Sequence, residues 1–271
     1  MPTAKTEYVT APDDLPARVV GPWVARKVHY VDRYAAIFAN GMKNRWKHRG
    51  YVELFAGPGV SYDRGQHQFV DGSALRALGM AFTDWAFVDL DPVASSALER
   101  RIAVRGRSSA AKVIQGDCND VVSQVRAAVA SDALTLAFID PTNWQVKLST
   151  IAALVESRHV DLLMTFHEGS MRRVGHLKDC NLDDFFDSGE WRQALQRPHH
   201  QRLDALLALY NRKLEELGYL TSSSLRVPVK NTKGVVMYDL VLFSRHERGI
   251  DFWQKAINGP DESGQSGLWD Q

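Results

Sequence analysis

The sequence predicts an α/β fold: a seven-stranded, mostly parallel sheet with helices on both faces and an antiparallel hairpin at its end. Two observations predict it. Short, continuously apolar runs alternate with segments of helical periodicity, which is typical of parallel strands that are buried on both faces. Near the end of the chain, two strand-like segments follow one another with only a turn at Asn231–Gly234 between them, as in a hairpin.

The first part of the chain supplies the parallel strands in order. A stripe of apolar residues at helical spacing predicts a leading helix at 24–45: Val28, Val31, Ala35 and Phe38. Five apolar runs then predict strands, and the periodic segments between them predict helices. The strands are expected at 51–55, 85–92, 112–117, 134–141 and 160–166, and the helices at 72–80, 92–104, 121–130 and 151–155.

The second part of the chain departs from this alternation. Residues 167–200 are polar, charged and aromatic, with one helix expected around 183–195, and we interpret them as an insertion that forms a lid over the substrate. Leucines three and four positions apart predict a long helix at 203–217. The remaining elements are two strands and a helix, expected at 221–229, 234–244 and 249–257.

We therefore expect one domain over residues 23–258, between a flexible N-terminal segment at 1–22 and a flexible tail at 259–271. Of the 271 residues, 45% are hydrophobic and 24% are charged, which is ordinary globular composition. The formal net charge of +1 gives no overall positive field that would attract nucleic acid.

Other classes of protein find no support in the sequence. Cys118 and Cys180 lack the spacing of a zinc site, so we expect no metal. The N-terminal segment lacks the pattern of a secretory signal, and no apolar run reaches membrane-spanning length. These features favour a cytoplasmic protein that does not associate with membranes.

The residues from Tyr51 to Gly59, with the sequence YVELFAGPG, form the most informative motif of the chain. They are typical of a strand that leads into a glycine-bearing turn, with Glu53 near the end of the strand. Ligands of open α/β sheets bind at the carboxyl ends of the strands, where glycines let the backbone approach them closely. Further acidic residues follow other predicted strands and are expected at the same edge: Asp89, Asp117 and Asp140.

These strands and acidic residues resemble the Rossmann-like fold of S-adenosylmethionine (SAM) methyltransferases. The resemblance implies that Glu53 lies near the methionine ammonium of the cofactor and that Asp89 accepts hydrogen bonds from both ribose hydroxyls. A carboxylate buried without a partner would be costly, which favours such a role for Glu53. The turn that passes under the methionine and ribose would consist of Phe55, Ala56, Gly57 and Gly59.

The resemblance also implies that Asp117 accepts a hydrogen bond from the adenine amino group, beside the backbone amide of Cys118. Other roles stay open for these residues. Asp117 could cap the helix that begins near Asn119, and Cys118 could simply fill space. Asp91, just before Pro92, fits a helix N-cap better than a ligand-binding residue.

The end of the fourth parallel strand, Asp140-Pro141-Thr142-Asn143-Trp144, resembles the Asp-Pro-Pro-Tyr-like turn of amino-methyltransferases. This likeness implies that Asp140 orients the methyl acceptor and that Trp144 stacks on a planar substrate. Thr142 replaces the second proline and the aromatic residue comes late, which argues against a flipped adenine. A plain turn, with Asp140 capping its own backbone, is the alternative. The chain has no Pro-Cys pair, which excludes DNA cytosine-carbon methyltransferases.

Motifs along nearly the whole chain are similar to the three-Cys-motif partner family, a methyltransferase-like group named for its association with a three-cysteine protein. The matching segments are Gly21-Pro22-Trp23 with Lys27, Tyr51–Gly59, Asp71-Gly72-Ser73, Phe138–Pro141, Tyr238–His246 and Gly249–Trp253. The family's fourth-strand turn resembles Asp-Pro-aromatic-Gly, from which Thr142-Asn143 departs. The resemblance implies SAM as cofactor and a three-cysteine protein as partner.

Basic residues and one histidine give weaker indications. The basic segment 43–49, around Trp46, fits cations near a helix C-terminus or a patch that faces nucleic acid. Arg172 and Arg173 could hold a phosphate or carboxylate of a substrate, or belong to a solvated loop. His167 could act as a base if its pKa lies near neutrality.

The sequence thus predicts a SAM-dependent methyltransferase that acts on a nitrogen or oxygen atom, with nucleic acid among the candidate acceptors. The first alternative is a non-catalytic scaffold that keeps the cofactor fold, which the altered turn at Thr142-Asn143 favours. The second is an NAD-dependent oxidoreductase, since an acid at the end of a second strand also suits the ribose of NAD. Against it, Tyr62 stands where a Gly-x-Gly-x-x-Gly motif needs its third glycine.

Overall fold

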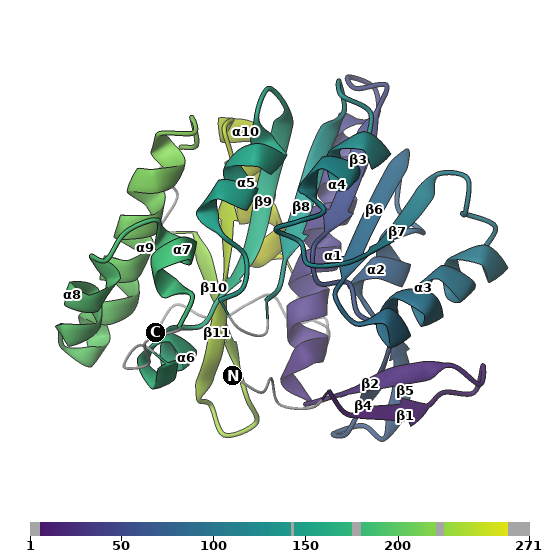
Figure 1. Ribbon diagram of the computed structural model, residues 1–271, viewed down its shortest axis with the longest axis horizontal. Coiled ribbons are helices and arrows are strands. Elements are labelled where there is room, and N and C mark those ends of the chain that lie inside the picture. Colours follow the sequence, from purple (N-terminus) through teal and green to yellow (C-terminus); the bar gives the residue numbers. More distant parts are fainter. Residues whose placement is uncertain (1–5, 142–143, 175–179, 221–224, 260–271) are drawn as a thin grey trace.

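The computed structural model describes residues 6–141, 144–174, 180–220 and 225–259 (Figure 1). Its main sheet has seven strands in the order β10-β11-β9-β8-β3-β6-β7. Five of them are parallel: β3 (Arg49–Glu53), β6 (Asp84–Asp89), β7 (Ala111–Gln115), β8 (Leu134–Ile139) and β9 (His159–Phe166). An antiparallel pair completes the sheet: β10 (Arg226–Lys230) and β11 (Val236–Phe243). The structure confirms the expected fold class.

Helices cover both faces of this sheet. One face carries α1 (Trp23–Met42), α2 (Ser73–Ala77), α3 (Pro92–Val104) and α10 (Glu247–Asn258). The other carries α4 (Val122–Ala128), α5 (Leu148–Val155), α7 (Leu182–Phe186), α8 (Trp191–Gln196) and α9 (His199–Glu215), and α6 (Glu168–Val174) follows the end of β9. Side chains alternate between two cores, as a strand requires: Tyr51 packs on the α1 side and Val52 on the α4 side.

Local sequence explains where the helices begin. Asp91 accepts a hydrogen bond from the backbone N–H of Val93 at 2.8 Å, and Pro92 occupies the first turn of α3. The interpretation of Asp91 as an N-cap is therefore confirmed. The buried face of α1 contains Val31, Ala35 and Phe38, as the helical spacing predicts.

The N-terminal segment differs from the expectation. Residues 8–20 form two strands of a second, small sheet with the order β1-β2-β4-β5, instead of a flexible segment. Its strands are β1 (Tyr8–Thr10), β2 (Pro16–Val20), β4 (Val60–Asp63) and β5 (Gln68–Asp71). Figure 1 shows this sheet below the carboxyl ends of the parallel strands. The prediction of a flexible segment is wrong because β2 pairs with β4, which lies about forty residues away in the chain. Local composition does not reveal such a pairing.

A buried arginine holds the small sheet on the main domain. Arg101 of α3 donates two hydrogen bonds to the carboxylate of Asp13, at 2.8 and 2.9 Å. It also donates to the carbonyl oxygens of Pro16 at 2.8 Å and Pro58 at 2.6 Å. Because Pro58 lies inside the glycine-bearing turn, one guanidinium joins the N-terminal strands to the motif at 51–59.

The segment after β9 also differs from the expectation. The single helix expected at 183–195 is two helices, α7 and α8, and α6 replaces an expected loop. The ring of Phe185 stacks on that of Tyr210 with centroids 4.7 Å apart, which fixes α7 against α9. The described residues 182–196 therefore belong to the helix layer. Parts of the expected insertion, hairpin, N-terminal segment and tail lie outside the described residues: 175–179, 221–224, 1–5 and 260–271.

Candidate functional site

A crevice lies at the carboxyl edge of the main sheet, where the small sheet meets the turn after β3. Its walls come from β2, α1, the 51–59 motif, β4, the start of α2, the ends of β8 and β9, and β11. The lining residues that matter below are Arg18, Lys27, Glu53, Phe55, Ala56, Gly57, Gly59, Ser73, Asp140, His167 and Tyr238. The chain thus brings its most informative motif to a concave surface.

Two glycines shape the turn that forms the floor of this crevice. Gly57 has φ of 63° and Gly59 has φ of 85°, both in the left-handed region that favours glycine. A methyl group on Gly59 would come within 2.8 Å of Leu98, so this position also needs glycine for packing. A methyl group on Gly57 would meet no atom within 4 Å, so open space lies beside this turn.

Asp89, the last residue of β6, holds the turn in place. Its Oδ2 accepts a hydrogen bond from the backbone N–H of Gly57 at 2.7 Å, and its Oδ1 accepts one from Asp91 at 2.9 Å. Each carboxylate oxygen keeps a second lone pair for another donor. The expected neighbours at the sheet edge, Asp89 and the glycine turn, therefore lie together.

Asp117 and Cys118 lie farther along the same edge, after β7. Asp117 Oδ1 accepts from the backbone N–H of Asn119 at 2.9 Å and from its side-chain amide at 2.8 Å. These bonds close a turn before α4, whose N-cap is Val121, so Asp117 does not cap that helix as the alternative proposed. Cys118 is 4% exposed and packs in the core, and burial raises the pKa of its thiol to about 12. This agrees with a space-filling cysteine.

Glu53 is almost fully buried at the wall of the crevice. Its carboxyl group accepts hydrogen bonds from the Ser73 hydroxyl at 2.5 Å and the Tyr51 hydroxyl at 3.1 Å. Burial raises its pKa to about 8, although both hydrogen bonds favour the ionised form. A cation close to Glu53 would therefore lower its pKa and favour the ionised form.

Asp140 follows β8 and has a different environment. It forms an ion pair with Lys27 of α1, and its Oδ1 accepts a hydrogen bond from the Thr165 hydroxyl at 2.8 Å. Burial opposes ionisation, but the Lys27 ammonium and the hydrogen bonds prevail and hold the pKa of Asp140 below its usual value. Asp140 is therefore ionised at neutral pH. The expected turn partners Thr142 and Asn143 lie outside the described residues.

Lys27 belongs to one of the sequence motifs, but the sequence alone gives it no role. A signal was present: Lys27 lies four residues before Val31 and so falls on the buried stripe of α1. Its side chain is only 12% exposed. A lysine on an apolar stripe indicates a buried carboxylate partner, because an unpaired ammonium would be costly there.

His167 and Tyr238 face the same part of the crevice, with ring centroids 4.8 Å apart. Burial lowers the pKa of His167 to about 4, so the near-neutral pKa that a base would need is absent. Within the described parts of the chain, its Nε2 and the hydroxyl oxygen of Tyr238 have no hydrogen-bond partner. Buried polar atoms are normally paired, so these two atoms suit a bound molecule.

Trp144 does not offer its ring to this crevice. It is 3% exposed and packs edge-on against Phe166 and Phe185, with centroids 5.5 and 4.8 Å away. Its indole N–H donates to the Ser170 hydroxyl at 3.0 Å. The expectation of a stacking residue is therefore not met, because both the apolar ring and its polar N–H have partners inside the fold.

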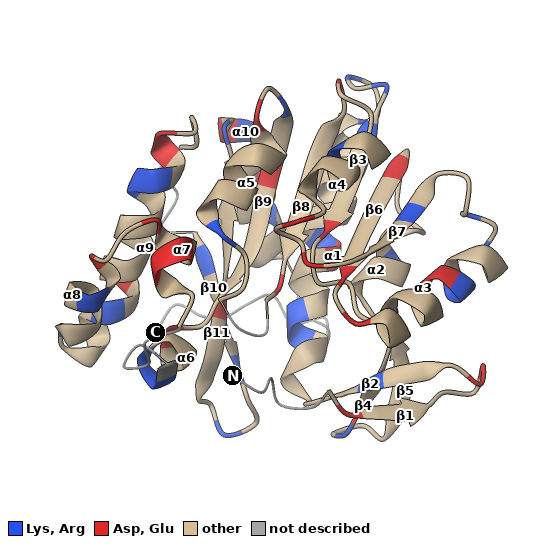
Figure 2. Cartoon of the chain, in the orientation of Figure 1, with Lys and Arg blue, Asp and Glu red and all other residues tan. Residues whose placement is uncertain are grey.

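The weaker basic candidates lie apart from one another. Arg172 and Arg173 are exposed on α6, and Trp46 of the segment 43–49 contacts His159, with ring centroids 4.9 Å apart. Figure 2 shows acidic and basic residues interspersed over the fold. Among the described residues, no cluster of three or more metal-binding side chains occurs. None of the described helices is both long and apolar enough to span a membrane.

Solved structures share this fold. An O-methyltransferase from Bacillus cereus, in complex with SAH, has 11% identity and a TM-score of 0.51 over 87% of this chain and 86% of its own. Cofactor-bound Rv0187 from MTB has 13% identity and a TM-score of 0.46, over 82% and 81% of the two chains. The METTL16 methyltransferase domain has 10% identity and a TM-score of 0.45, over 83% and 68%.

Comparisons of sequence alone find no match. No protein-family model matches the chain, and no curated protein matches it. The likeness to the Bacillus cereus enzyme, together with the strand order and the closing antiparallel pair, shows that this chain has the Rossmann-like fold of a methyltransferase.

Proposed function

We propose that this protein is a SAM-dependent methyltransferase that acts on a nitrogen or oxygen atom. One observation carries the proposal: Asp89 holds the glycine turn beside a crevice that has Glu53 and Asp140 in its walls. The fold shared with an SAH-bound O-methyltransferase supports it. Acidic strand ends and a left-handed glycine turn at one edge are what a nucleoside-sized cofactor with a cationic amino group requires.

The residues of this chain suit the cofactor part by part. Glu53 would face the methionine ammonium, and that cation would lower the raised pKa of this buried carboxyl group. Asp89 would accept hydrogen bonds from the ribose hydroxyls through its free lone pairs. Asp117 and the backbone of Cys118 would receive the adenine. When bound, SAM supplies a methyl group that a nucleophile can attack.

The acceptor would enter between Asp140, His167 and Tyr238. Ionised Asp140 would accept a hydrogen bond from the acceptor N–H or O–H, which orients the lone pair of that atom toward the methyl group. The unpaired Nε2 of His167 and the Tyr238 hydroxyl would hold the remaining polar atoms. Orientation is the main contribution we assign to these residues, because bringing the two reactants into line lowers much of the barrier.

The three-Cys-motif partner family and a three-cysteine partner protein belong to the same proposal. The family is supported by the placement of two motif residues, Lys27 and Asp140, in one ion pair, and the partner protein follows from the resemblance to that family alone. A scaffold that binds SAM without transferring a methyl group is the second candidate. The burial of Trp144 favours it, because that ring offers no stacking surface for an acceptor.

Calorimetry with SAM, SAH and NAD tests the cofactor. We expect SAM and SAH to bind in the micromolar range and Asp89→Ala to weaken both by about 10-fold or more, since two ribose hydrogen bonds are lost. Asp120→Ala is the matched control, because Asp120 is an exposed acid near the same edge. Binding of NAD in place of SAM would overturn the proposal.

Transfer of a radiolabelled methyl group from SAM to nucleic acid, protein and small-molecule pools tests the activity. We expect Asp140→Asn to lower the rate of transfer by about 100-fold while the affinity for SAM stays within about 3-fold. If SAM binds but no pool is labelled, the scaffold is correct and the enzyme is not.

A further inference from the structure

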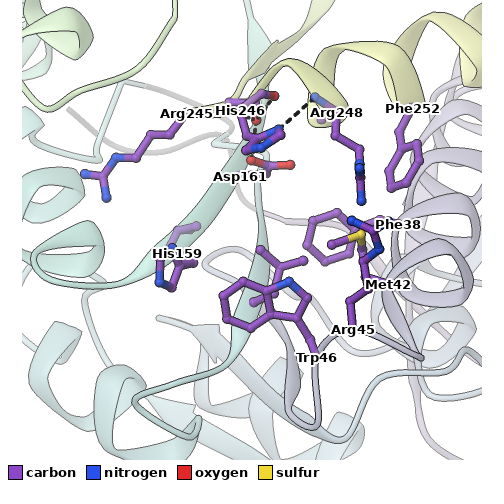
Figure 3. A pocket seen from close by; sticks show the side chains of 14 residues that line it. Phe38, Met42, Arg45, Trp46, His159, Asp161, Arg245, His246, Arg248 and Phe252 are labelled. Carbon is purple, nitrogen blue, oxygen red and sulfur yellow. Dashed lines mark hydrogen bonds between the residues drawn. The ribbon is translucent and has the colours of Figure 1, made fainter.

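A second pocket lies at the opposite edge of the main sheet, where β8 and β9 begin and β11 ends (Figure 3). It shares no lining residue with the crevice described above. The walls come from the end of α1, the segment after it and the start of α10. The proposed methyl transfer makes no use of this pocket.

One side of the pocket is apolar and aromatic. Phe38 and Met42 of α1, Trp46 and Phe252 of α10 line it. Trp46 is partly exposed and makes a T-shaped contact with His159, with ring centroids 4.9 Å apart. Aromatic and thioether side chains form a surface on which a planar ring packs well.

Two arginines enter the pocket from different elements. Figure 3 shows the side chains of Arg45, from the turn after α1, and Arg248, from the start of α10, both reaching into it. Within the described parts of the chain, neither guanidinium forms an ion pair or a hydrogen bond. Two guanidinium groups in one pocket repel each other, and an anion between them would pair with both.

The other charged residues of the pocket are already engaged. Asp161, the sole acid among the described lining residues, accepts hydrogen bonds from the hydroxyls of Ser244 at 2.6 Å and Tyr34 at 2.7 Å. Arg245 donates to the carbonyl oxygens of Val155 and Arg158 and lies over the ring of Tyr219. Asp161 forms no ion pair with either arginine among the described residues, so both guanidinium groups keep their donors for a ligand.

We propose that this pocket binds a free mononucleotide. Its base would pack on Trp46 and Phe252, and its phosphate would lie between Arg45 and Arg248. A ligand that is both planar and anionic matches an aromatic wall beside two unpaired cations. A free nucleotide fits better than a nucleic-acid strand, because the net charge is +1 and strand binding needs many phosphate contacts.

Calorimetry with adenosine 5′-monophosphate as the probe tests this site, with and without saturating SAH to fill the other crevice. We expect binding in the micromolar range that SAH does not change. Arg45→Ala with Arg248→Ala, and separately Trp46→Leu, should each weaken it by about 10-fold or more. Adenosine and inorganic phosphate should each bind at least about 10-fold more weakly, since each lacks one half of the ligand. Arg100→Ala, an exposed arginine of α3, is the control and should change nothing.

Three results would overturn the site. The first is the absence of binding at millimolar nucleotide. The second is nucleotide binding that SAH abolishes, or that persists unchanged in the double variant Arg45→Ala with Arg248→Ala. Either outcome would place the nucleotide outside this pocket. The third is a single-stranded oligonucleotide that binds more tightly than the mononucleotide through the same arginines, which replaces the free ligand with a strand. Arg45 is exposed, so the arginine variants remain informative even if Trp46→Leu fails to fold.

Discussion

The two edges of the main sheet handle buried carboxyl groups differently. At the carboxyl edge, Lys27 holds the pKa of Asp140 below its usual value, whereas burial raises the pKa of Glu53 to about 8. At the amino edge, burial raises the pKa of Asp161 to about 6. Glu53 and Asp161 each have two hydroxyl donors and no ion pair among the described residues, and Asp140 has an ammonium.

Asp140 differs from the other two acids in its cation and also in its burial, because 21% of its side chain is exposed whereas Glu53 and Asp161 are buried. Both differences favour the ionised form of Asp140. Hydroxyl groups partly replace water around Glu53 and Asp161, but they carry no charge to offset the cost of desolvation. The amino edge does have cations, Arg45 and Arg248, yet neither pairs with Asp161. At the carboxyl edge, Lys27 and Asp140 thus pair with each other. At the amino edge, Arg45 and Arg248 have no ion-pair partner among the described residues and can bind a ligand.

The largest expected effect comes from breaking the Lys27–Asp140 pair. Lys27→Met leaves a buried carboxyl group without its cation and should cost about 3–5 kcal/mol of stability near pH 8. In the wild type, the lowered pKa of Asp140 contributes stability above its ordinary pKa that is lost as the pH falls. In the variant that pKa should rise, so stability should instead fall as the pH rises. Urea unfolding at pH 5 and pH 8 measures the difference.

The double variant Lys27→Met with Asp140→Asn is the control for this pair. It removes both charges and should recover most of the lost stability, since no buried charge remains. A loss of equal size at pH 5 and pH 8, or no recovery in the double variant, would show that Lys27 acts through packing alone.

An effect of opposite sign is expected at Glu53. Its pKa is about 8 when folded, above its ordinary value of 4.5, so between these pH values the folded protein holds a proton that the unfolded chain has lost. Stability therefore falls as the pH rises from about 4.5 to 8. Glu53→Gln cannot ionise and should be more stable at pH 8 by up to about 4 kcal/mol, with the difference vanishing near pH 4.

Thermal unfolding across this pH range checks the Glu53 prediction, with Glu99→Gln on the exposed face of α3 as control. Glu53→Gln should also weaken SAM binding, because the methionine ammonium of SAM loses its carboxylate partner. A Glu53→Gln variant that is less stable than wild type at pH 8 contradicts the raised pKa of Glu53.

The smallest expected effect is at the amino edge. The pKa of Asp161 is about 6 when folded, against an ordinary value of 3.8, so its contribution falls between pH 4 and 6 and is constant above. Asp161→Asn should flatten the pH dependence of stability in that window by up to about 3 kcal/mol. Thermal unfolding between pH 4 and 8 measures it, and Asp120→Asn should leave the slope unchanged. A slope that Asp161→Asn leaves intact would assign the titration to another group.

The sequence by itself determined the parallel sheet, the helix that begins at Pro92 and the placement of acidic residues at one edge. These features depend on alternation, capping and strand ends, which residues close in the chain encode. Only the tertiary structure decided that Lys27 pairs with Asp140, that Arg101 ties down Asp13 and that Trp144 is buried. Those partners lie far apart in the chain, 113 residues for the ion pair, and only folding brings such residues together.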